Sequence, residues 1–160
     1  MKEFTKADMS ASMAEYEKKW AIRMLDLATH VAQWSKDPST KVGAVIADNE
    51  MRVVSLGYNG FPRSVTDSVA RYQDRALKHK MVVHAEANAI LNARIDVTTC
   101  MMYTTMFPCS DCAKLIIQAG ILQIYYLKIL DHDPWKEDVN IAQSMFSESF
   151  VQTIQVTKNE

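Results

Sequence analysis

From residue 42 onward, strand-like apolar runs alternate with helical segments, and this alternation limits the fold more than any other feature. The strand-like runs are residues 42–46, 51–56, 98–105, 122–127 and 151–156. The helical segments between them are residues 84–94, 109–119 and 136–147. A turn at 48–50 joins the first two runs into a predicted hairpin. Helices that alternate with strands cover the faces of a central sheet, so the sequence predicts a three-layer α/β/α domain.

A long amphipathic helix precedes the alternating region. Large apolar side chains recur at steps of three and four, which places them on one helix face: Tyr16, Trp20, Met24, Leu27, Val31 and Trp34. We expect this stripe to join the core and the helix to end at 36–38, because a proline disfavours helical geometry in the residue before it. Residues 1–12 are expected to form a flexible extension of a single domain spanning 1–160.

Two further segments have simple local interpretations. Residues 57–62 contain Gly57 and Gly60, and we expect a loop in which the glycines permit unusual backbone angles. The charged stretch 71–80 is expected to be a solvated helix or loop.

Composition excludes several classes of protein. The 160 residues are 48% apolar, which is ordinary for a packed core and too high for a disordered chain. The 18 basic residues oppose 19 acidic ones, and a net charge of −1 argues against binding long nucleic acid through a basic face. No segment is apolar enough to suggest a membrane span or a secretory signal. Three cysteines, two of them close together, are typical of a reduced compartment, so we expect a cytoplasmic protein.

The residues that can carry chemistry stand at two predicted helix starts. His84-x-Glu86 opens one helix and Cys109-x-x-Cys112 opens the next. Each half alone is a weak signal, because a lone Cys-x-x-Cys fits a structural zinc site or a redox pair equally well. Together they supply two thiolates and one imidazole. Three protein ligands leave one tetrahedral position open, which is typical of catalytic Zn²⁺, and Glu86 is left as a proton shuttle.

Other metal-binding candidates are weaker. Cys100 is the only spare cysteine, and we expect it to be an ordinary buried strand residue. His30, His79 and His132 have no partner at ligand spacing, so each is interpreted as an ordinary histidine.

The combination of motifs resembles the cytidine and deoxycytidylate deaminase family, in particular its deoxycytidylate (dCMP) deaminase branch. His-x-Glu followed by Pro-Cys-x-x-Cys is a known signature of zinc nucleobase deaminases. Beyond it, the resemblance rests on the segments 35–44, 57–62, 84–90 and 112–121. Many relatives have glycine where this chain has Ser64, and some carry a Cys/His-rich insertion. Residues 62–83 contain no cysteine, so no second zinc site is expected there.

The resemblance implies a mixed five-stranded sheet and the hydrolysis of dCMP to dUMP and ammonia. In such a site, activated water attacks C4 of cytosine while Glu86 protonates N3 and then the departing amine. The Ala85 N–H would hold the base O2, and Asn59 would reach the sugar. The resemblance also implies a homo-oligomer, with dCTP and dTTP as possible effectors acting through the 57–62 loop.

Several cytosine substrates are compatible with the sequence. CMP, dCTP, C5-modified dCMP and polynucleotides are alternatives to dCMP, and a non-catalytic zinc scaffold is a third class that has no use for Glu86. For a phosphate group, the turn at Ser39 and Thr40 with the ammonium of Lys41 is the candidate partner. The alternative is that Lys41 is a solvated loop lysine.

Overall fold

The structure is a computed structural model that describes residues 6–157, with side chains described from residue 11. Five strands form one mixed sheet in the order β2-β1-β3-β4-β5. They are β1 (Gly43–Ala47), β2 (Val53–Tyr58), β3 (Met101–Met106), β4 (Gln123–Lys128) and β5 (Gln152–Gln155). β1 runs antiparallel to β2 and β3, whereas β3, β4 and β5 are parallel. The predicted hairpin and the mixed five-stranded sheet are confirmed.

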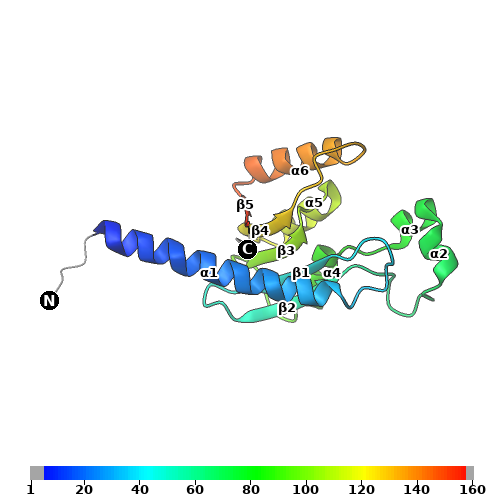
Figure 1. The fold of residues 1–160 in the computed structure, drawn as a ribbon, viewed down its shortest axis with the longest axis horizontal. Coiled ribbons are helices and arrows are strands. Elements are labelled where there is room, and N and C mark those ends of the chain that lie inside the picture. Colours follow the sequence, from blue (N-terminus) through cyan, green and yellow to red (C-terminus); the bar gives the residue numbers. More distant parts are fainter. Residues whose placement is uncertain (1–5, 158–160) are drawn as a thin grey trace.

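Helices cover both faces of this sheet (Figure 1). α1 (Lys6–Ala32) packs on one face, while α4 (Ala85–Asn92), α5 (Ser110–Gln118) and α6 (Lys136–Glu148) pack on the other. The alternation of side chains along β1 feeds both cores, because Val45 and Ala47 face α1 while Ala44 and Ile46 face α4 and α5. The predicted three-layer α/β/α architecture is therefore confirmed.

α1 differs from the prediction at both ends and in its buried face. It begins at Lys6, so residues 6–12 are helical rather than a flexible extension, and residues 1–5 lie outside the described part. Its N-terminal half projects beyond the sheet (Figure 1). The last helical residue is Ala32, and Trp34 is half exposed, as is Tyr16. Met24 and Val31 of the predicted stripe are buried, and Trp20 and Leu27 pack partly buried against the same core. The rest of the buried face consists mostly of small side chains beside them: Ala21, Leu25, Ala28 and Ala32.

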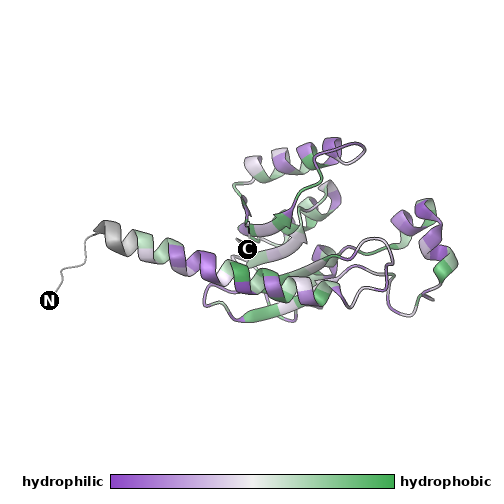
Figure 2. Cartoon of the chain, viewed as in Figure 1, coloured by the Kyte–Doolittle hydropathy of each residue, from purple (hydrophilic) through white to green (hydrophobic). Residues whose placement is uncertain are grey.

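The segment between β2 and α4 forms a separate lobe (Figure 1). It contains two short helices, α2 (Val69–Gln73) and α3 (Arg75–Met81), which pack against each other and against no other helix or strand of the described residues. Figure 2 shows this lobe as mostly hydrophilic. The expectation that 71–80 is fully solvated is wrong at Tyr72 and Lys78, which are both buried.

Gly57 serves a purpose that the sequence analysis did not foresee. It lies within β2 without a left-handed backbone, so the prediction of unusual angles is wrong there. A Cβ at Gly57 would come within 2.1 Å of the Ala85 carbonyl oxygen and 2.3 Å of the Ala89 nitrogen. Glycine is needed because α4 passes directly over the strand.

None of the helices in the described residues is long and apolar enough to cross a membrane.

Candidate active site

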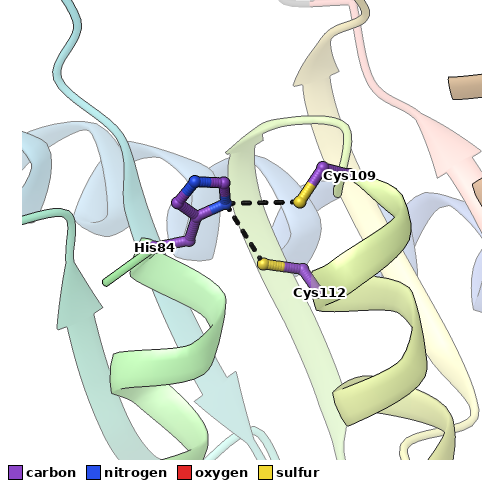
Figure 3. A group of neighbouring side chains, drawn as sticks. All are labelled: His84, Cys109 and Cys112. Carbon is purple, nitrogen blue, oxygen red and sulfur yellow. Dashed lines mark hydrogen bonds between the residues drawn. The ribbon is translucent and has the colours of Figure 1, made fainter. Parts of the chain in front are cut away.

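Two helix starts bring the predicted metal ligands together (Figure 3). His84 caps α4 and Cys109 caps α5, with Cys112 one turn further along α5. The His84 Nδ1 atom lies 3.3 Å from Cys109 Sγ and 3.5 Å from Cys112 Sγ. All three ligand atoms lie within 4.8 Å of one another.

The donor set fits zinc. Tetrahedral Zn²⁺ with bonds of about 2.3 Å to sulfur and about 2.0 Å to nitrogen requires N···S separations of about 3.5 Å. The two observed separations are close to this value. Among the described residues, no other group of three metal-binding side chains converges in this way, and Cys100 is buried apart from the cluster. Three ligands from the chain leave one position for water or substrate.

The electrostatics of the cluster favour a thiolate at the start of α5. Hydrogen bonds from the Cys112 thiol and from His84 lower the pKa of Cys109 to about 4. The partner of that thiolate, His84, has its pKa raised to about 9 by the same hydrogen bond. The positive end of the helix dipole acts in the same direction at Cys109.

Glu86 lies beside the cluster without belonging to it. Its side chain is buried, and burial raises the pKa of the carboxyl group above its ordinary value. One oxygen accepts a hydrogen bond from the Thr104 hydroxyl at 3.3 Å, and the other lies 3.6 Å from the Cys112 sulfur. A buried carboxyl group with a raised pKa next to a metal site is suited to take up and release a proton during a reaction.

A cavity of about 590 Å³ opens onto this cluster. Its wall includes Glu86 and the metal ligands His84 and Cys109, together with the two predicted substrate contacts Ala85 and Asn59. The Ala85 N–H lies in the first turn of α4, where it has no hydrogen-bond partner among the described residues and can donate to a carbonyl group.

Asn59 is largely engaged by the protein itself. Its side-chain oxygen accepts from the Val42 N–H at 2.9 Å, and its amide nitrogen donates to the Thr40 carbonyl oxygen at 2.9 Å. One amide hydrogen therefore remains for a ligand. The same contacts fix the loop before β1, which is a structural role that the sequence analysis did not predict.

Lys41, the predicted phosphate-binding lysine, lies outside the cavity. It is exposed, it is not part of the cavity wall, and its ammonium group lies 3.4 Å from the Gln33 carbonyl oxygen. The turn at Ser39 and Thr40, which was predicted to bind phosphate together with Lys41, instead binds the side chain of Asp37. The Asp37 carboxylate accepts hydrogen bonds from the N–H groups of Ser39 and Thr40 and from the Ser39 hydroxyl. The structure does not bring Lys41 to the site, because this turn closes on itself.

The lobe contributes residues that sequence reasoning missed. Arg75, Lys78 and His79 of α3 line the cavity, and the His79 ring packs 5.6 Å from the ring of Trp135. No spacing signal marks these residues, because their partners lie far away along the chain. An Asp followed by Pro-Ser-Thr is a recognisable turn signature, so the role of Asp37 could have been found from the sequence.

Asp138 is a further missed residue, at the start of α6. Its carboxylate accepts a hydrogen bond from the Ser110 N–H at 3.0 Å and another from the Ser110 hydroxyl. Ser110 follows Cys109 directly, so Asp138 caps α5 from another helix and holds the metal-binding turn.

Comparison with known proteins gives a consistent result. The family model described as "Cytidine and deoxycytidylate deaminase zinc-binding region" matches residues 18–128. An uncharacterised deaminase from the luxG 3′ region of Aliivibrio fischeri is 44% identical over 136 residues, which cover 84% of this chain and 91% of that protein. Human deoxycytidylate deaminase is 40% identical over 134 residues, or 80% of this chain and 74% of the human protein.

The fold is also similar to solved structures of the dCMP deaminase from cyanophage S-TIM5. The apo form has a TM-score of 0.69 at 23% identity, covering 86% of this chain and 97% of that chain. The form in complex with dCMP and dUMP has a TM-score of 0.61 at 21% identity, covering 96% of this chain and 99% of that chain.

Proposed function

Because the chain belongs to the cytidine and deoxycytidylate deaminase family, we propose that it hydrolyses dCMP to dUMP and ammonia. The observation that carries this proposal is the buried Glu86 carboxyl group beside the converging ligands His84, Cys109 and Cys112, at the base of one cavity. A structural zinc site needs the ligands but not the carboxyl group. The relatives named for dCMP deamination supply the choice of substrate.

The residues have distinct roles in this reaction. His84, Cys109 and Cys112 would hold zinc, which when bound makes water a stronger nucleophile at neutral pH. Glu86 takes a proton from the attacking water and delivers it to N3 of the cytosine ring. As the bond from the water oxygen to C4 forms, the ring becomes tetrahedral at C4. Glu86 then takes the proton of the new C4 hydroxyl group and passes it to the exocyclic amine; the C4–N bond breaks, the C4 carbonyl group forms, and ammonia leaves.

The Ala85 N–H and Asn59 orient the substrate. The first-turn N–H of α4 points its partial positive charge at the base O2, which shares with N3 the electron density that the attack on C4 releases. The remaining amide hydrogen of Asn59 donates to the sugar. Burial of both residues keeps these donors in place.

Assembly and control belong to the same proposal. We propose a homo-oligomer, supported by large apolar side chains on the surface, among them Leu91, Ile95 and Phe150, which is 88% exposed. dCTP and dTTP are the proposed effectors. We place the enzyme in the cytoplasm, since its metal-binding thiols need a reducing environment.

A substrate panel tests the activity. Zinc-loaded protein is offered dCMP, CMP, dCTP, deoxycytidine, single-stranded DNA and tRNA, and ammonia release is measured for each. The proposal expects the highest kcat/KM for dCMP, and a higher value for any other substrate would replace it. Saturation curves with and without dCTP and dTTP, with light scattering for mass, test the effectors and the oligomer separately.

A further inference from the structure

The cavity extends from the metal cluster to a wall of basic side chains on α3. Arg75, Lys78 and His79 all line it, and the end of α3 at Met81 lies only three residues before His84. Figure 2 shows the helices of this lobe as mostly hydrophilic. A cavity of about 590 Å³ exceeds what a cytosine ring needs and is in the range of a complete nucleotide site.

Lys78 is fixed and already neutralised. Its ammonium nitrogen lies 2.9 Å from one oxygen of Asp37 and 3.2 Å from the other, and it donates to the Ser39 hydroxyl at 2.7 Å. Both members of the ion pair are buried. Since an ammonium group has three donors and at least two are used here, Lys78 serves first to fasten α3 to the loop before β1.

Arg75 has no such partner. It lies one turn before Lys78, on the same side of α3, and its exposed side chain forms no ion pair with any described residue. Partial burial lowers the pKa of His79, and the nearby charges of Lys78 and Arg75 lower it further, although Asp37 opposes them. An anion bound at this wall would compensate that excess of positive charge.

We infer that Arg75 binds the 5′-phosphate of the substrate and that Lys78 positions α3 for this contact. This inference rests on the proposed function and replaces Lys41 as the phosphate-binding residue. A nucleoside monophosphate carries a charge between about −1.5 and −2 at neutral pH, and a guanidinium group binds phosphate oxygens through two parallel hydrogen bonds. Arg75 therefore selects a phosphorylated substrate over the nucleoside.

Kinetics on paired substrates test the assignment. KM and kcat are measured for dCMP and deoxycytidine with the wild type and with Arg75→Ala, Lys80→Ala and Lys41→Ala. Lys80 is the matched control, an exposed lysine on the same helix that does not line the cavity. Arg75→Ala should raise KM for dCMP at least tenfold, leave kcat/KM for deoxycytidine within twofold and leave kcat for dCMP little changed. Both lysine variants should keep both substrates within twofold of the wild type.

Equal effects of Arg75→Ala on the two substrates would overturn the inference, and a selective loss in Lys41→Ala would move the phosphate site to the 39–41 turn. Calorimetry with dUMP and deoxyuridine keeps the two proposals separable. If the wild type releases no ammonia from dCMP, the proposed function fails. The phosphate site still stands if dUMP binds at least tenfold more tightly than deoxyuridine and Arg75→Ala removes that difference. If the wild type binds dUMP and deoxyuridine equally tightly, the phosphate site is refuted.

Discussion

The two ends of the cavity are built in different ways. At the metal end, α4 packs on β1 and β2, and α5 packs on α4, so the ligands stand on helices fixed to the sheet. At the other end, α2 and α3 pack against each other and, within the part of the chain that the structure describes, against no other helix or strand. Side-chain contacts fasten this lobe: the Lys78–Asp37 ion pair, the exposed Lys36–Asp67 ion pair and the stacked rings of Phe61 and Tyr72, 4.4 Å apart.

This difference in packing places the groups for proton transfer on the rigid part of the molecule and the groups for substrate binding on the lobe. A site that moves protons needs its groups held within a fraction of an ångström, and helix starts on a sheet provide that rigidity. A lobe that is fastened by a few side-chain contacts can change its substrate contacts without moving the catalytic groups. We therefore expect substitutions at the metal end to reduce turnover, and substitutions in the lobe to change KM or stability.

The largest effect is expected at Glu86. Glu86→Gln keeps the size of the side chain but removes its ability to transfer protons, so kcat should fall by about 10²–10⁴-fold. Zinc content, measured by atomic emission, should stay near one ion per chain because Glu86 is not a ligand. Cys109→Ala should instead lose the metal.

Glu50→Gln is the control, since Glu50 is an exposed carboxylate in the β1–β2 turn. Turnover near the wild-type level in Glu86→Gln would refute the proton-transfer role and, with it, the contrast between the two ends.

The next effect concerns the stability of the lobe. Lys78→Ala leaves the Asp37 carboxylate buried without its cation, which typically costs about 3–5 kcal/mol of the free energy of unfolding. Lys80→Ala, on the same helix but exposed, should change that free energy by less than about 0.5 kcal/mol. Urea denaturation at pH 7 measures both. A loss below 1 kcal/mol in Lys78→Ala would show that the ion pair does not hold the lobe.

The same pair predicts a dependence on pH. Burial raises the pKa of Asp37, but hydrogen bonds from Ser39 and Lys78 outweigh it and hold this pKa below its ordinary value. A carboxyl group whose pKa is lower in the folded state stabilises the protein above its unfolded pKa of about 3.9, and this contribution disappears as the pH falls through the folded pKa. The difference between wild type and Lys78→Ala should therefore be constant from pH 5 to 8 and shrink below pH 4.

Sequence reasoning reached the metal end and missed the lobe for a physical reason. His84, Cys109 and Cys112 stand at helix starts that local patterns predict, and their residue types are specific for a metal. Lys78 and Asp37 lie 41 positions apart, and their pairing depends on how the lobe folds back over the loop before β1. The charged stretch 71–80 has no sequence pattern that identifies Lys78 as its buried lysine.

The glycines illustrate the same limit within the fold. Two glycines in 57–62 suggest a loop with unusual backbone angles, yet Gly57 is needed for close packing and Gly60 is not. Gly57→Ala should cost about 1–3 kcal/mol of unfolding free energy and reduce kcat, because its Cβ would push against the carbonyl oxygen of Ala85. Gly60→Ala should be tolerated within about 0.5 kcal/mol, since nothing lies within 4 Å of a Cβ at that position. Equal costs for the two variants would mean that α4 is not held against β2 as described.

The smallest effect is expected at the entrance to the lobe, where Ser64 has a backbone φ of 67°. An L side chain is disfavoured in this left-handed region, and glycine adopts it readily. Ser64→Gly should therefore raise the free energy of unfolding by about 0.5–1 kcal/mol, after the greater flexibility of glycine in the unfolded chain is taken into account.

Ser68→Gly is the matched control, for which the free energy of unfolding should change in the opposite direction. Ser68 has a φ of −130° and accepts a hydrogen bond from the Arg71 N–H at the start of α2, so glycine there should cost a few tenths of a kcal/mol. Because neither Ser64 nor Ser68 lines the cavity, kcat should be unchanged in both variants. A Ser64→Gly protein with altered kcat would show that the two ends of the cavity are coupled more tightly than their separate packing indicates.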